Sequence, residues 1–159
     1  MNSPTADKQL NALKLICFVL PTGAGLFTII AFFLGPDSSS FATDPTILRI
    51  VLLAMAVALF SVQRLLRKKL LSGNQAMRSG DNTFINRYYT ASLVQLATTE
   101  GVALFSAVIL IQIPPSVKAI DPISYLHLLP LFWLVLVARS VYPSTEKIEA
   151  LQQYYQPAS

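Results

Sequence analysis

Charged residues are scarce in this chain. Lysine, arginine, aspartate and glutamate make up 13% of its 159 residues, about half the share that is usual in soluble globular domains. Apolar residues make up 53%, and they come in long blocks rather than as one stripe along each predicted helix. This composition excludes a soluble domain with a large core and predicts a protein that crosses a membrane several times. The length leaves no room for a separate soluble catalytic domain.

Residues that could carry chemistry are also few. Cys17 is the only cysteine, so the chain cannot form an internal disulfide bond. His127 is the only histidine and has no second histidine or cysteine near it in the sequence, so we expect an interfacial or hydrogen-bonded residue, no metal site and no cofactor. The sequence contains no phosphate-binding loop and no pairing of a nucleophile with a base. An enzyme is therefore the least expected class.

Four apolar blocks predict an all-α membrane protein, a bundle of four transmembrane helices arranged as two hairpins. A basic loop at residues 63–88 joins the second and third spans, and Ser144 caps a short final helix that ends near Tyr154. Pro130 lies inside the fourth span, where it should kink the helix or free a carbonyl that a neighbouring helix satisfies. The spans cover about residues 15–34, 47–62, 89–113 and 123–138.

Basic side chains gather on one side of this topology, and the opposite side carries only Arg49 and Lys118. The excess of lysine and arginine predicts that both termini and the basic loop face the cytoplasm at a bacterial inner membrane. This placement argues against nucleic acid as a partner, while a basic run beside a span could also bind anionic membrane lipid or a partner protein. The basic residues of this side are Arg64, Arg67, Lys68, Lys69, Arg78 and Arg87 in the loop and Lys8, Lys14, Arg139 and Lys147 in the tails.

Glu100 is the only charged residue of the third span and falls near its middle. A carboxylate at this depth costs several kcal/mol, and without a basic residue nearby desolvation should favour the neutral acid. Glu100 could therefore bind a proton or a sodium ion, together with Thr22 and Thr99. It could equally be a structural residue that hydrogen-bonds across helices to Thr22 or to a carbonyl freed by Pro21, or it could meet another protein. Nearby interhelical hydrogen bonds are expected from Gln95, Thr98 and Thr99.

The first and third spans resemble each other in register. Residues 22–28 read Thr-Gly-Ala-Gly-Leu-Phe-Thr, and residues 100–106 read Glu-Gly-Val-Ala-Leu-Phe-Ser, which suggests an internal duplication of one helical hairpin. Small residues at this level predict close packing among spans one, two and three, with span four at the periphery. The residues predicted to make this packing are Gly23, Gly25, Ala54, Ala58, Ala97 and Gly101.

Two resemblances to known families follow from these residues. Residues 99–108, Thr-Glu-Gly-Val-Ala-Leu-Phe-Ser-Ala-Val, follow a basic loop and are similar to the outer helix of rotary ATPase proteolipid (c) subunits, although the second span lacks their dense glycine repeat. That resemblance implies a proton- or sodium-carrying carboxylate at Glu100. The chain as a whole resembles a family of uncharacterised small four-span bacterial membrane proteins, which implies no known activity. The residues that carry this second resemblance are Glu100-Gly101, Leu104-Phe105 and residues 143–149, Pro-Ser-Thr-Glu-Lys-Ile-Glu.

The sequence therefore favours a small structural or accessory subunit, not an enzyme, that assembles with itself or with a larger membrane complex. The alternative is a proteolipid-like proton or sodium carrier that uses Glu100. A third hypothesis is a handler of small solutes or lipids, which would need a cavity beside Glu100 and Thr22.

Overall fold

The computed structural model describes residues 4–35, 45–71 and 81–155, and these residues form an all-α bundle without strands. Four segments are long and apolar enough to cross a membrane, namely Asp7–Phe33, Thr46–Leu71, Phe84–Gln112 and Ile123–Val141. The predicted fold class is confirmed. The helices are α1 (Pro4–Phe33), α2 (Pro45–Leu71), α3 (Asp81–Gln112), α4 (Pro115–Ile120), α5 (Ile123–Leu126), α6 (Leu129–Val141) and α7 (Thr145–Tyr155).

The helices extend past the predicted spans at the basic end. α2 continues to Leu71 and α3 begins at Asp81, so much of the predicted loop 63–88 is helical. Leucine, arginine and lysine dominate the end of α2, and all three favour helix, which is why the chain keeps this conformation beyond the apolar block. Leu71 is 1% exposed and anchors the extension in the core. Arg78 lies in residues 72–80, outside the described residues.

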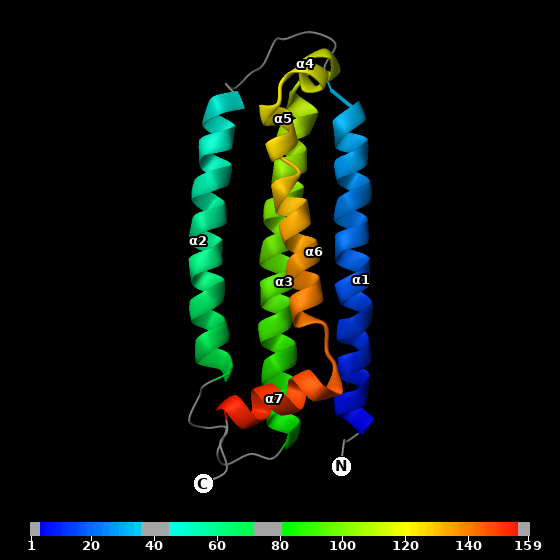
Figure 1. Cartoon of the computed structure of the whole chain (residues 1–159), viewed down its shortest axis with the longest axis vertical. Coiled ribbons are helices and arrows are strands. Elements are labelled where there is room, and N and C mark those ends of the chain that lie inside the picture. Colours follow the sequence, from blue (N-terminus) through cyan, green and yellow to red (C-terminus); the bar gives the residue numbers. More distant parts are fainter. Residues whose placement is uncertain (1–3, 36–44, 72–80, 156–159) are drawn as a thin grey trace.

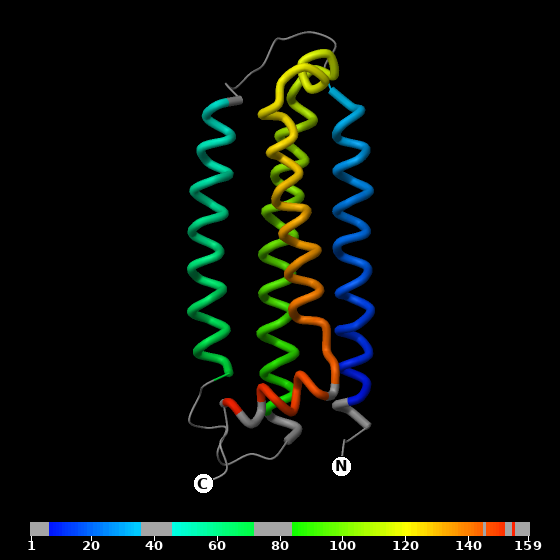
Figure 2. The backbone as a smooth tube through the Cα atoms, in the orientation of Figure 1, coloured from blue at the N-terminus to red at the C-terminus, as the bar shows by residue number. Residues whose placement is uncertain are grey.

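α3 is the central helix of the bundle. α1 and α2 lie on either side of it and α6 lies in front (Figures 1 and 2). α6 packs against both α1 and α3, because Leu134, Val137, Ala138 and Val141 form a buried stripe at helical spacing. α2 packs mainly against α3, and only 6% of its span is buried, against 39% for the span in α3. The prediction that span four is peripheral is wrong: span two occupies that position.

The fourth span is interrupted rather than continuous. α5 ends at Leu126, and α6 begins at Leu129 with Pro130 in its first turn. Proline is tolerated at that position because the first N–H groups of a helix have no intrahelical partner. Pro130 therefore begins a new helix after a break instead of kinking a continuous one.

α7 lies across the basic end of the bundle, and α1 begins at that same end (Figure 1). The Ser144 hydroxyl accepts a hydrogen bond from the Lys147 backbone N–H at 3.3 Å, which confirms the predicted cap. Ile148 is buried in the core. In the same cluster, the Tyr88 hydroxyl donates to the Val141 carbonyl at 2.7 Å, where α6 ends. These contacts fix the short final helix to the bundle.

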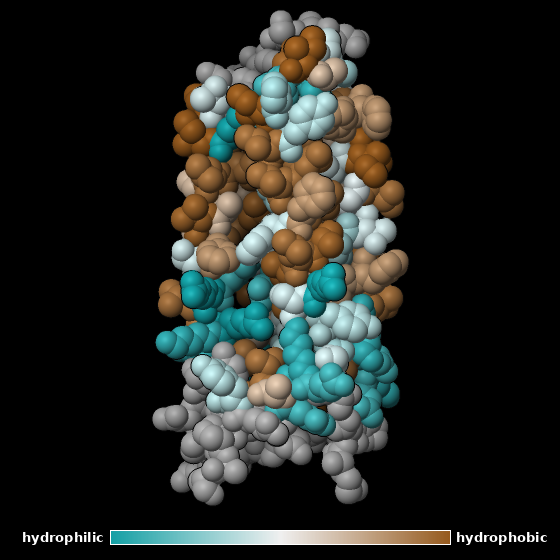
Figure 3. Space-filling model, viewed as in Figure 1, coloured by the Kyte–Doolittle hydropathy of each residue, from teal (hydrophilic) through white to brown (hydrophobic). Residues whose placement is uncertain are grey.

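Large apolar side chains cover the outside of the spans. Figure 3 shows them as a broad brown band, with hydrophilic residues gathered toward the end that carries α7. Phe33 and Phe18, for example, are 76% and 71% exposed. An apolar surface of this extent favours contact with lipid rather than with water. The chain is therefore a multi-pass membrane protein.

Candidate functional site

Glu100 lies on the central helix α3, at the border between its packed face and an exposed strip. Leu96 and Ala103, about one turn away on either side, are buried, whereas Ala97 and Gly101 are exposed. Because successive residues are about 100° apart around a helix, the Glu100 side chain leaves α3 between these two faces. It is partly buried, and it makes no hydrogen bond or ion pair with another residue in the described part of the chain.

The structure does not bring the three predicted ion-binding residues together. Thr22 is exposed, and its hydroxyl donates to the Phe18 carbonyl of its own helix at 2.8 Å. Thr99 is buried on another face of α3, where its hydroxyl donates to the Gln95 carbonyl at 2.7 Å. The hypothesis that Glu100 hydrogen-bonds to Thr22 is therefore corrected, and Glu100, Thr22 and Thr99 do not form a common site within one chain.

The six small residues predicted to pack the helices face outward. A Cβ atom added to Gly23, Gly25 or Gly101 would meet no atom within 4 Å, so none of these glycines lies at a close helix contact in this chain. Ala24, between the first two glycines, is 1% exposed and occupies the packed face instead. The prediction of close packing through these residues is thus wrong for contacts within one chain. The alanines among the six are all exposed, namely Ala54, Ala58 and Ala97.

Gln63 of α2 is the centre of a group of hydrogen bonds that joins α2 to α3. Its amide nitrogen donates to the Gln95 carbonyl at 3.3 Å, to Thr99 Oγ1 at 3.2 Å and to Thr98 Oγ1. Both threonine hydroxyls donate to carbonyls of their own helix, which leaves their lone pairs to accept from Gln63. Arg67, one turn further along α2, donates to Gln95 Oε1 at 3.2 Å. The interhelical bonds expected from Gln95, Thr98 and Thr99 are confirmed.

The role of Gln63 has only a weak signal in the sequence. It follows directly on the apolar block of α2 and precedes a basic run, so it resembles the first residue of a loop. The helix continues, however, and Gln63 is buried at 8% exposed. A buried amide needs hydrogen-bond partners, and the threonines of the facing helix are the one sequence feature that could have predicted them.

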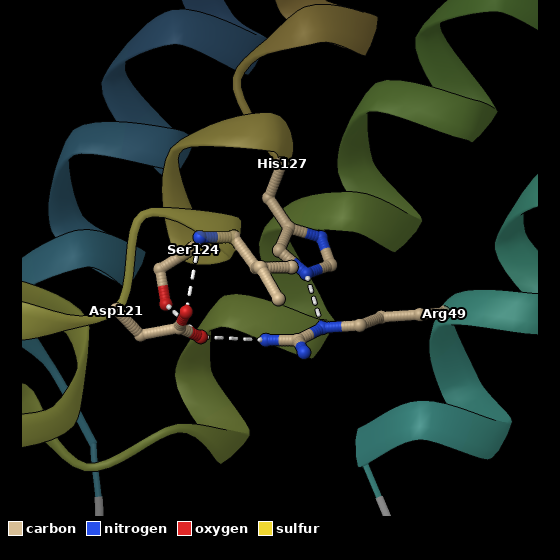
Figure 4. A network of polar contacts seen from close by, with 5 residues as sticks. Arg49, Asp121, Ser124 and His127 are labelled. Carbon is tan, nitrogen blue, oxygen red and sulfur yellow. Dashed lines mark hydrogen bonds and ion pairs between the residues drawn. The ribbon is translucent and has the colours of Figure 1, made fainter.

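A second polar cluster (Figure 4) lies beside α5, at the end of the bundle away from α7 (Figure 1). Arg49 of α2 reaches Asp121, which precedes α5, with Nη2 3.2 Å from Oδ2, and its Nε donates to His127 Nε2 at 3.4 Å. The Asp121 carboxylate also accepts from the Ile123 N–H at 3.0 Å and from the Ser124 hydroxyl at 3.5 Å. These bonds join the peripheral helix α2 to the interrupted fourth span. Sequence spacing could not indicate them, because Arg49 lies more than seventy residues before its partners.

The arrangement around His127 fixes the position of its ring proton. Nε2 accepts from Arg49, so the proton of the neutral ring lies on Nδ1. Nδ1 is 3.1 Å from Ser106 Oγ and donates to it, while Ser106 donates to the His127 carbonyl at 2.9 Å. A histidine that activates a serine must accept its proton, and here the hydrogen bond runs the other way. Ser106 and His127 therefore hold the break in the fourth span against α3.

Lys118 of α4 closes the end of α1. It is 1% exposed, and its Nζ donates to the Ala31 carbonyl at 2.7 Å and to the Leu34 carbonyl. A cation suits this position because the last carbonyls of a helix lack partners and carry partial negative charge. Burial lowers the pKa of Lys118 below its usual range. The same corner needs Gly35, where a Cβ atom would lie 2.5 Å from the Ile113 carbonyl oxygen.

No protein-family model, curated protein or solved structure matches this chain. Within the described residues, no group of three or more histidine, cysteine, aspartate or glutamate side chains could hold a metal ion. The geometry by itself defines the class, a multi-pass α-helical membrane protein. Its central helix carries a glutamate that has no polar partner among the described residues, and polar clusters fasten α2 and the interrupted span.

Proposed function

We propose that this chain is a small structural or accessory subunit, without catalytic activity, that assembles with itself or with a larger membrane complex. The observation that carries the proposal is the position of Glu100. It lies within a membrane span, at the edge of an exposed strip, without a polar partner among the described residues of its own chain. A partner from outside the chain would complete the site.

The cost of leaving Glu100 unpaired supports this proposal. An ionised carboxylate at the centre of a transmembrane helix costs about 2.5–3.5 kcal/mol on insertion scales, and a neutral carboxyl still carries a donor and an acceptor that lipid cannot satisfy. A polar group on a neighbouring subunit would offset this cost with interhelical hydrogen bonds, which contribute about 0.6 kcal/mol each on average.

The small residues beside Glu100 supply the space for such a neighbour. Ala97 and Gly101 lie one turn apart on the exposed strip of α3, and nothing occupies the space in front of Gly101. Small residues four positions apart allow two helix backbones to approach closely in lipid. The residues that do not pack this chain internally are thereby available for packing against another one.

We further propose that the protein resides in a bacterial inner membrane with both termini in the cytoplasm. The proposal is supported by the unequal distribution of basic residues between the two ends of the bundle. One end carries Arg64, Arg67, Lys68 and Lys69 on α2 and Lys147 on α7, whereas Arg49 and Lys118 lie at the other end. Lysine and arginine are retained on the cytoplasmic side during insertion.

The assembly proposal is tested by photocrosslinking in the native membrane. A photoreactive benzophenone amino acid placed at Ala97 should form a crosslinked product with a second copy or with another membrane protein, identified by mass spectrometry. The matched position is Leu136, which is 58% exposed on α6 and should contact lipid alone. The proposal would be contradicted if no crosslinked protein product formed at position 97, or if the yield of crosslinked protein were equal at positions 97 and 136.

Substitutions at Glu100 separate assembly from ion carriage. Glu100→Gln keeps hydrogen-bonding capacity and should retain the Ala97 crosslink, whereas Glu100→Leu and Gly101→Leu should reduce it by about three- to tenfold, as expected for the loss of about 1 kcal/mol. A crosslink that is unchanged in both leucine variants would show that this strip is not the interface.

The alternative function, a proteolipid-like carrier of protons or sodium ions, is favoured by the partial exposure of Glu100 on the flank of α3. A carrier requires a carboxyl that ionises reversibly. Infrared difference spectroscopy against Glu100→Gln, together with labelling by a hydrophobic carbodiimide, distinguishes the two. A carboxyl band that titrates between about pH 6 and 9 with fast labelling would favour the carrier, since a shift of this size is typical of functional carboxyls. A carboxyl that stays protonated and unreactive would favour the structural role.

A further inference from the structure

A groove runs between α2 and α6, on the face of the bundle that lies away from α1. Because α2 packs mainly against α3, the two helices leave a cavity of about 480 Å³ between them. In Figure 3 the surface is visibly hollowed between the two helices, and the hollow opens toward the surroundings. Its volume falls within the range of roughly 300–1,000 Å³ that is typical of pockets for small ligands.

The walls of the groove are almost entirely apolar. Leu59 and Phe60 come from α2, and Pro130 and Trp133 come from α6, with Val102 of α3 on the floor. The Phe60 and Trp133 rings meet edge to face with their centroids 5.9 Å apart, so they bridge the two helices. In a membrane, a lateral apolar opening of this kind is filled by a hydrocarbon chain rather than by water.

Polar groups lie at one end of the groove only. Gln63 and Thr99 line that end, and Arg67 follows one turn later on the same face of α2. Arg67 bonds to the neutral amide of Gln95 rather than to a carboxylate in the described part of the chain. A guanidinium has five N–H donors, so Arg67 retains donors for a further anionic oxygen.

The depth of these groups matches the two parts of a phospholipid. α2 has 27 residues and is about 40 Å long, which exceeds a hydrocarbon core of roughly 30 Å, so its basic end extends into the headgroup region. The charges there are of one sign along α2, which carries Arg64, Arg67, Lys68 and Lys69 and no acidic residue. Basic pockets between transmembrane helices on the cytoplasmic side bind anionic headgroups.

We propose that the groove between α2 and α6 is a binding site for one anionic phospholipid. An acyl chain occupies the apolar groove along Phe60 and Trp133, and the phosphate binds Arg67 beyond Gln63. The site lies on a different face from the exposed strip beside Glu100, so it does not depend on the assembly proposal. It also gives α2 packing partners that the protein itself does not supply.

Trp133 makes the site directly measurable, because it is the only tryptophan of the chain. The experiment measures quenching of Trp133 fluorescence in nanodiscs of ordinary phosphatidylcholine. One sample contains a low mole fraction of phosphatidylglycerol with dibrominated acyl chains, and the other contains the same mole fraction of phosphatidylcholine with dibrominated acyl chains. Trp133 is 46% exposed, so lipids of the surrounding bilayer quench it in both cases. Selective binding should give brominated phosphatidylglycerol an apparent affinity about fivefold higher than brominated phosphatidylcholine, as expected for one basic contact.

Matched variants locate the preference. Arg67→Gln should bring the ratio of the two affinities, for brominated phosphatidylglycerol and brominated phosphatidylcholine, close to one. Arg64→Gln removes the same charge from an exposed position at the same end, and this variant should retain most of the preference for phosphatidylglycerol. Ala56 lines the groove, and Ala56→Phe should fill it and abolish the preference. Ala58 is exposed and lies outside the groove lining, so Ala58→Phe adds the same bulk without this effect.

Three outcomes would overturn the proposal. Equal quenching of the unmodified protein by both brominated lipids would show contact with surrounding lipid only. Equal losses in Arg64→Gln and Arg67→Gln would show a diffuse attraction to the basic end instead of a site. Quenching that is weak with both lipids and grows when the protein is diluted would show that a second copy covers the groove.

Discussion

Gly35 is the residue at which the packing of this protein is tightest among the described glycines. It follows α1 and lies against the turn between α3 and α4, where Ile113 and Pro115 surround it. Gly23, in the middle of the same helix, has open space in front of it. Packing within the chain therefore requires glycine at position 35 but not at position 23.

Gly35→Ala should lower the free energy of unfolding by about 1–3 kcal/mol, as overpacking usually does. The added Cβ atom would lie 2.5 Å from the Ile113 carbonyl oxygen and 3.0 Å from Pro115 Cδ, and backbone cannot move aside as a flexible side chain can. Unfolding by sodium dodecyl sulfate in mixed micelles measures the change. Gly23→Ala is the control, and it should leave stability unchanged or raise it because alanine favours helix. Similar effects of both substitutions would contradict the interpretation.

The peripheral helix α2 illustrates how elements are held together here. Its apolar surface is largely exposed, so its attachment depends on polar contacts near its two ends. Gln63 and Arg67 bind α3 near the basic end, and Arg49 binds the interrupted fourth span at the other. Between transmembrane helices such contacts matter because lipid removes the hydrophobic driving force that operates in water.

A double-mutant cycle tests the attachment at Arg49. Arg49→Ala and Asp121→Ala should show a coupling energy of about 1 kcal/mol, since their side chains are each 26% exposed and solvent weakens the ion pair. Equilibrium unfolding in bicelles supplies the energies. The control pairs Arg49→Ala with Glu149→Ala, which lies at the far end of the bundle. Their effects on the free energy of unfolding should be additive within about 0.5 kcal/mol. Additivity of the Arg49 and Asp121 substitutions as well would mean that the pair does not hold α2.

The two ends of the molecule differ in charge, because the end that carries α7 and the start of α1 is also the more basic one. Lys118 and Arg49 serve the other end, but there they are engaged by helix carbonyls and by Asp121. The end with α7 therefore presents the greater share of positive charge, which is the property that sets orientation during insertion.

Reporter fusions test this orientation. Alkaline phosphatase fused after the C-terminal residue should be inactive, and green fluorescent protein at the same place should be fluorescent, since both termini are predicted to be cytoplasmic. Alkaline phosphatase inserted after Ala119, an exposed residue of α4, should be active. The reverse pattern, with an active C-terminal phosphatase, would show that the basic end faces outward.

The sequence by itself determined the number of spans, the side on which basic residues gather and the Ser144 cap, because block hydrophobicity, charge and capping act locally. Only the tertiary structure decided which faces of the helices pack. A span can be apolar on every side, so its pattern does not show which side meets protein, and Gly23 and Gly25 therefore flank the buried Ala24 instead of making the contact. The tertiary structure likewise decided three further features, namely the break at His127, the attachment of Arg49 and the groove beside Trp133. Each of them depends on residues that lie far apart in the chain.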